Sequence, residues 1–127
     1  MTTDYSNILD RNFNLAKKVI RLSKDGKVEV KNKDKLNGPD QILLYLIGKL
    51  YAKESGLSES DDVGSKELLD ELGIIENSLW PWLKDLRDNN IIKQRKIGKF
   101  RNHFIPINLV ERHLKEIDKK LSESGDA

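Results

Sequence analysis

The sequence predicts a mainly α-helical protein with one small β-hairpin, which is an α+β fold class. Apolar residues recur at intervals of three and four in several segments, as is typical of amphipathic helices. Two strand-like segments near 91–107 meet at Gly98-Lys99, which suits a hairpin turn. The 127 residues include 37% hydrophobic and 35% charged side chains, as in a single globular domain with a heavily solvated surface.

At the N-terminal end we expect a helix near 6–22 and then a short strand over 27–31. Four apolar residues spaced four, three and four apart form the inward stripe of the helix: Leu9, Phe13, Ala16 and Ile20. Asp25-Gly26 marks a turn, and beyond it Val28 and Val30 alternate with charged neighbours. Residues 1–36 are therefore interpreted as an extension of the main domain.

Three further helices are expected in the centre of the chain, near 40–54, 65–72 and 78–89. The first is apolar most of the way round, which predicts a position sandwiched in the core. Ser65 is the expected cap of the second helix, and Asn77 or Ser78 that of the third. Gly73 and Asn90 follow these two helices, because both residue types tolerate the left-handed backbone of a helix end.

A last helix is expected near 108–121, where Asn108 and Glu111 have capping-box spacing. Its apolar seam consists of Val110, Leu114, Ile117 and Leu121. This seam and the N-terminal stripe together exceed what so small a core should need. We therefore expect them to pair across a two-fold axis and to form a homodimer.

Residues 66–105 follow the order short helix, glycine turn, helix and hairpin. The second of these helices places Leu79, Leu83 and Leu86 four and three apart, and Asn90-Ile91-Ile92 precedes the hairpin. This pattern resembles the winged helix-turn-helix layout of MarR-like and ArsR-like regulators, including many small archaeal ones. The resemblance implies a single winged-helix domain over 1–127, with its core at 39–107 and a terminal helix at 108–122. It does not indicate a named subfamily.

In DNA-binding members of this superfamily the second helix enters the major groove, and the hairpin, called the wing, contacts phosphates or the minor groove. Between Asn89 and Val110 this chain has five bases and no acid: Lys93, Arg95, Lys96, Lys99 and Arg101. The resemblance thus implies a transcriptional regulator that binds double-stranded DNA, with these side chains on phosphates. Ser78, Lys84 and Arg87 would lie near bases. The alternative for the hairpin is a solvated edge protected from aggregation by its charges.

The outward face of the helix near 78–89 is poorly suited to reading bases. Asp85 and Asp88 lie on that face, where a carboxylate near phosphate is unfavourable. The second functional hypothesis is therefore a winged-helix protein–protein interaction module within a larger complex, using Trp80, Pro81 and Trp82. A purely structural interpretation places one tryptophan under the wing and the other against the first helix of the motif. The functional interpretation presents one tryptophan to a protein partner or to a stacked base.

No catalytic site, metal site or cofactor is predicted. The chain has no cysteine, and His103 and His113 lie on different predicted elements without zinc-ligand spacing. Gly98-Lys99 lacks the rest of a phosphate-binding loop, and the acidic residues at 58–62 look like a flexible solvated loop. No apolar run approaches the ~18 residues needed to cross a bilayer, and no secretion signal is evident. We expect a cytoplasmic protein that is not an enzyme.

Overall fold

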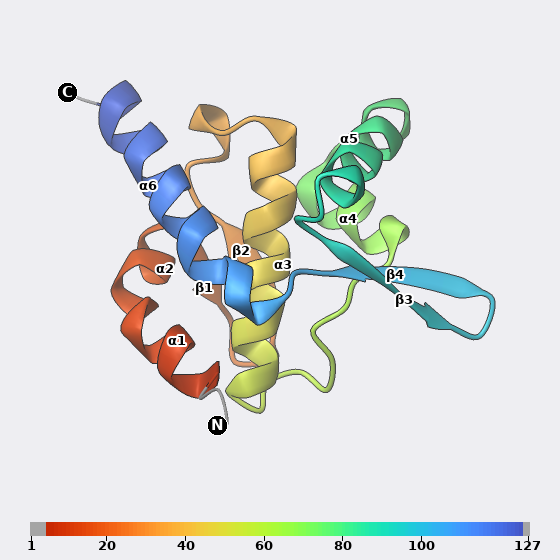
Figure 1. The fold of residues 1–127 in the computed structure, drawn as a ribbon, viewed down its shortest axis with the longest axis horizontal. Coiled ribbons are helices and arrows are strands. Elements are labelled where there is room, and N and C mark those ends of the chain that lie inside the picture. The colour runs from red at the N-terminus through yellow and green to blue at the C-terminus, as the bar shows by residue number, and fades with distance from the viewer. Residues whose placement is uncertain (1–4, 126–127) are drawn as a thin grey trace.

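The computed structural model describes residues 5–125 and is mainly helical, with two short antiparallel hairpins (Figure 1). The elements in chain order are α1 (Tyr5–Arg11), α2 (Phe13–Val19), β1 (Ile20–Leu22), β2 (Val28–Val30), η1 (Lys33–Lys35), α3 (Gly38–Glu54), α4 (Ser65–Leu72), α5 (Glu76–Asp88), β3 (Lys93–Ile97), β4 (Phe100–Phe104), η2 (Ile107–Leu109) and α6 (Val110–Gly125). The predicted α+β class is therefore confirmed.

Helix α3 lies at the centre of the molecule. Helices α1, α2 and α6 lie on one side of it, and α4, α5 and the β3–β4 hairpin on the other (Figure 1). Residues 42–48 are all buried, which confirms the helix predicted to be sandwiched in the core. Asn37 starts α3, because its side-chain oxygen accepts a hydrogen bond of 2.8 Å from the backbone N–H of Asp40.

The prediction of one helix near 6–22 is wrong. The chain breaks at Asn12, whose side-chain amide donates to the carbonyl of Ile8 (2.8 Å) and to the carboxylate of Glu111 (3.0 Å). Helix α2 ends at Val19, and the next three residues form β1, with Ile20 opposite Val30. The apolar spacing of the stripe fits a helix, but pairing with β2 takes precedence at its last residues.

The two terminal segments pack against each other within one chain. Apolar residues of both the N-terminal stripe and the C-terminal seam belong to the same buried core, although Phe13 is 53% exposed. Glu111 accepts hydrogen bonds from Arg11 and Asn12, so it does not complete a capping box, and Asn108 lies within η2. The Arg11 and Asn12 bonds lower the pKa of Glu111 to about 2. The apolar surplus that led us to expect a homodimer is therefore largely covered within one chain.

The ends of the central elements are close to those predicted, with two corrections. Gly64 rather than Ser65 is the N-cap of α4, and α5 begins at Glu76 without a side-chain cap, so Asn77 and Ser78 lie in its first turn. Gly73, Asn90 and Gly98 have φ values of 66°, 60° and 62°, which confirms the two predicted helix ends and the hairpin turn.

Candidate nucleic-acid interface

The β3–β4 hairpin extends away from the helices as an arm (Figure 1). Its strands pair from Lys93 opposite Phe104 to Ile97 opposite Phe100. The base of the arm is held by a short bridge between Val63 and His103, whose backbone groups exchange hydrogen bonds of 2.7 and 2.8 Å. The arm is thus anchored at its base, and residues 96–101 at its outer end are exposed.

Four cations on this arm are exposed and have no carboxylate partner within residues 5–125: Lys93, Lys96, Lys99 and Arg101. We call them the free wing cations. Lys96 and Arg101 stand directly opposite each other across the two strands. Like charges in that position repel and destabilise a sheet, and a bound anion would relieve the repulsion.

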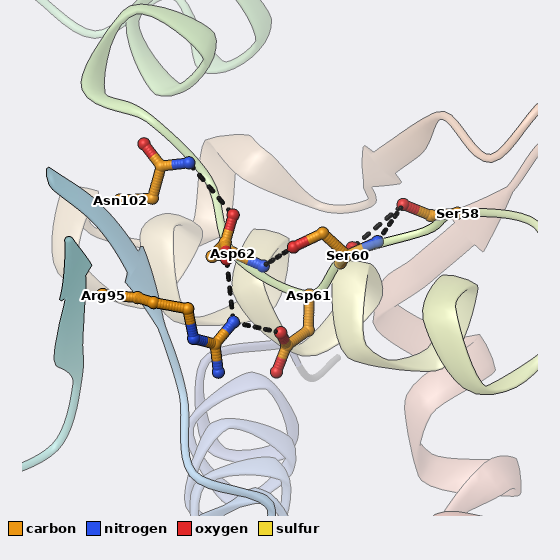
Figure 2. Close-up of polar contacts among 6 residues, drawn as sticks. All are labelled: Ser58, Ser60, Asp61, Asp62, Arg95 and Asn102. Atoms are coloured by element: carbon orange, nitrogen blue, oxygen red, sulfur yellow. Dashed lines mark hydrogen bonds and ion pairs between the residues drawn. The ribbon is translucent and has the colours of Figure 1, made fainter. Parts of the chain in front are cut away.

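Arg95 differs from these four cations. Its Nη1 donates to carboxylate oxygens of Asp61 and Asp62, both at 2.8 Å, and its guanidinium lies 4.2 Å from the centre of the Phe104 ring (Figure 2). Both contacts engage the guanidinium within the chain, although the Arg95 side chain is 41% exposed. We therefore remove Arg95 from the expected phosphate contacts.

The acidic loop at 58–62 is ordered where it meets the hairpin, which corrects the expectation of a flexible solvated loop. Asp61 and Asp62 are buried, and Asn102 donates to Asp62 over 3.0 Å (Figure 2). Burial by itself would raise the pKa of Asp62, but hydrogen bonds from Asn102, Arg95 and Ser60 outweigh it and keep the pKa below its usual value. These bonds keep the carboxylate ionised and hold the loop against the base of the arm.

Helix α5 faces inward as predicted, with Leu79, Leu83 and Leu86 buried. On its outer side, Lys84 donates to Asp88 over 2.8 Å, so its charge is already compensated. Lys84 is one of the three residues expected near bases. The other two, Ser78 and Arg87, are partly buried.

The two tryptophans have different roles in the structure. Trp82 is partly buried, and its ring lies against Gly38 at the start of α3 so closely that a Cβ there would overlap it. This position confirms the expected contact of one tryptophan with the first helix of the motif. Trp80 is 48% exposed, so the expectation that the other tryptophan is buried under the wing is wrong.

Trp80 lines a hollow of about 430 Å³ between α5, the first turn of α4 and the β3–β4 hairpin. We call it the wing hollow. It is lined by Gly64, Ser65, Lys66, Trp80, Gln94, Lys99, Phe100, Arg101, Asn102 and His103, none of which is acidic. Sequence reasoning missed Lys66, because Lys66 lies in an acid-rich segment and only the fold brings it to the wing.

His103 is the most buried residue that lines the wing hollow. It is 1% exposed, and its Nδ1 has no hydrogen-bond partner within the described residues. Burial, together with the positive charge of nearby Arg87, lowers its pKa to about 4. His103 is therefore neutral at physiological pH, where its imidazole both donates and accepts hydrogen bonds.

No known family model, curated protein or solved structure matches this chain significantly. Within residues 5–125 no helix is long and apolar enough to cross a membrane. The same residues contain no group of three or more side chains placed to hold a metal ion.

Proposed function

We propose that this chain is a winged helix-turn-helix protein that binds double-stranded DNA and acts as a transcriptional regulator. The order of its elements supports the fold: α3, the bridge residue Val63, α4, α5 and then the β3–β4 wing. The antiparallel bridge between Val63 and His103 pairs the segment before α4 with the base of the wing.

The observation that carries the proposal is the set of free wing cations. Within the described residues the carboxylates that form ion pairs with the wing are those of Asp61 and Asp62, and both bind Arg95. The other four cations remain available on an exposed arm, where they suit the regularly spaced charges of a phosphate backbone. Phosphate contacts set affinity and orientation, whereas sequence is read by contacts to base edges.

Helix α5 supplies few groups that read bases. Asp85 and Asp88 are exposed, and Lys84 is paired with Asp88. Ser78 and Arg87 are the remaining candidates for base contacts on this helix. We therefore propose that the wing supplies most of the affinity and that discrimination between DNA sequences is modest.

The test is charge reversal on the wing. Lys99→Glu combined with Arg101→Glu should lower affinity for a short duplex at least about tenfold, because favourable phosphate contacts become repulsive. Both residues are exposed and have no ion pair among the described residues, so the circular dichroism spectrum and the thermal midpoint should be unchanged. Binding is measured by fluorescence anisotropy at low salt.

The matched control is Lys24→Glu combined with Lys119→Glu. It makes the same change in net charge at two exposed lysines outside the wing that have no ion pair with any residue in 5–125. The control should retain most of the affinity. An equal loss in both double variants would show that only net charge matters, and no duplex binding by the wild-type protein would refute the proposal.

The second candidate function is a protein–protein interaction module within a larger complex. The exposure of Trp80 favours it, because tryptophan is enriched in the anchoring positions of interfaces. Pro81 beside it is exposed too, whereas Trp82 is taken up by its contact with Gly38. Absence of duplex binding by a wild-type protein with an intact wing would favour this function.

A further inference from the structure

Two large aromatic side chains stand exposed on the lining of the wing hollow. Trp80 is 48% exposed and Phe100 is 69% exposed. Elsewhere Trp82 packs on Gly38, Phe104 lies beneath Arg95, and Phe13, which is 53% exposed, has Lys17 over its ring. Two exposed rings on the lining of one hollow form an apolar patch of the kind that marks binding sites.

The groups around these rings suit an anionic ligand. Lys66, Lys99 and Arg101 contribute three positive charges to the lining, and none of its residues is acidic. The first turn of α4 lines the same hollow and has no side-chain cap, so its backbone N–H groups add to the positive potential.

The hollow holds polar groups as well. Gln94 is exposed on its lining, whereas the Nδ1 atom of neutral His103 is buried behind it, out of contact with solvent. An exposed side-chain amide forms hydrogen bonds with the edges of nucleobases. One hollow thus combines aromatic faces, cations and an amide that can form hydrogen bonds with a base.

We infer that the wing hollow binds an unpaired nucleotide, with its base stacked on Trp80 or Phe100 and its phosphate near Lys66, Lys99 and Arg101. A base inside a duplex is covered by its neighbours, so only an unpaired base offers its face to a side chain. This inference rests on the proposed function and makes it more specific. The preferred DNA is a duplex that carries a single-stranded tail.

The test compares three labelled DNAs: a blunt duplex, the same duplex with an oligothymidine tail, and the tail strand alone. The wild-type protein should bind the tailed duplex about tenfold more tightly than the blunt one, which is within the usual range for one stacked base. Trp80→Ala or Phe100→Ala should reduce this preference and leave blunt-duplex affinity unchanged. Trp80→Phe should retain most of it, because phenylalanine still offers an aromatic face.

Tryptophan fluorescence gives a second readout that does not depend on affinity. Stacking should quench the emission of Trp80 when the tailed duplex binds. In Trp80→Phe only Trp82 emits, and it lies against Gly38, so the quenching should disappear although binding persists. Ile75→Ala is the control, because Ile75 is 72% exposed and outside the hollow, and it should leave both readouts unchanged.

The outcomes separate the two proposals. Equal binding of blunt and tailed duplex, or unchanged Trp80 emission, would overturn the inference while duplex binding stands, and would favour a protein partner for Trp80. Binding of the tail without any duplex binding would support the inference and refute the proposed duplex-binding function. Binding of none of the three DNAs would refute both.

Discussion

Two neighbouring cations on β3 show how position decides the role of a charge. The side chains of Arg95 and Lys96 point to opposite faces of the strand. Arg95 meets two buried carboxylates, whereas Lys96 faces Arg101 and has no carboxylate partner within the described residues. Removing Arg95 would leave two desolvated carboxylates without their cation, which destabilises the fold. Removing Lys96 would leave no buried charge unpaired.

We therefore predict different effects of the two alanine substitutions. Arg95→Ala should lower the free energy of unfolding by about 2 kcal/mol or more at neutral pH, since the buried carboxylates lose their cation. Lys96→Ala should change it by less than about 0.5 kcal/mol but should weaken duplex binding. Urea unfolding of both variants at pH 7, followed by circular dichroism, gives the comparison.

The pH dependence supplies a check on this prediction. The pKa of Asp62 lies below its ordinary value of 3.8. The ion pair between Asp62 and Arg95 therefore makes its full contribution to stability above about pH 3.8. It is lost as the pH falls through the folded-state pKa, so the difference between wild-type and Arg95→Ala should narrow in acid. A similar loss of stability in both alanine variants, independent of pH, would contradict the assignment of Arg95 to an internal cluster.

At the scale of elements, the contact between Trp82 and Gly38 sets how closely α5 approaches the start of α3. The ring occupies the space that a Cβ at position 38 would need. Glycine is therefore required at that position for steric reasons, although α3 begins there and alanine is the better helix former. The close approach also explains why Trp82 is partly buried while Trp80, two residues earlier, is exposed.

Gly38→Ala should lower the free energy of unfolding by about 1–3 kcal/mol, because the ring and the helix must move apart. A decrease in the free energy of unfolding would be informative, because glycine-to-alanine changes in helices without such a contact usually increase it. In a Trp82→Leu background the same change should cost much less, and a double-mutant cycle in urea measures the coupling. Additive effects would show that the two residues do not meet.

At the scale of the whole molecule, the terminal helices complete the core of a single chain. Helix α6 packs against α1, α2 and α3, and Arg11 binds Glu111 at 2.9 Å. The stripe and the seam that suggested a dimer are largely buried in this way. The free wing cations lie on an arm that extends from the opposite side of α3 (Figure 1). One chain therefore carries a complete wing, and we propose the monomer as the DNA-binding unit.

The salt dependence of binding follows from this arrangement. Roughly three to four phosphate contacts per chain should give a slope of about −3 in log K against log salt concentration, because each neutralised phosphate releases counterions. Anisotropy titrations from low to moderate salt measure the slope, and sedimentation equilibrium should give a mass near 14.6 kDa for the free protein. A slope near zero would mean that affinity does not come from the wing, and a mass twice as large would restore the dimer.

The sequence by itself determined the features that depend on neighbouring residues. Apolar spacing predicted that α3 is buried and that Leu79, Leu83 and Leu86 face inward. Turn chemistry predicted the helix ends at Gly73 and Asn90 and the hairpin turn at Gly98, and all three residues have a left-handed backbone. These features are local, because a residue's backbone preference and its position on a helix face are set within a few positions along the chain.

Only the tertiary structure decided which charges are free and which aromatic rings are exposed. Arg95 and Asp61 are 34 positions apart, and Arg11 and Glu111 are 100 apart, so no local pattern links either pair. The wing hollow similarly combines groups from α4, α5 and the hairpin. Helical periodicity placed Trp80 and Trp82 on their helix, but packing against α3 decided which ring is covered, because burial depends on what the fold brings opposite each side chain.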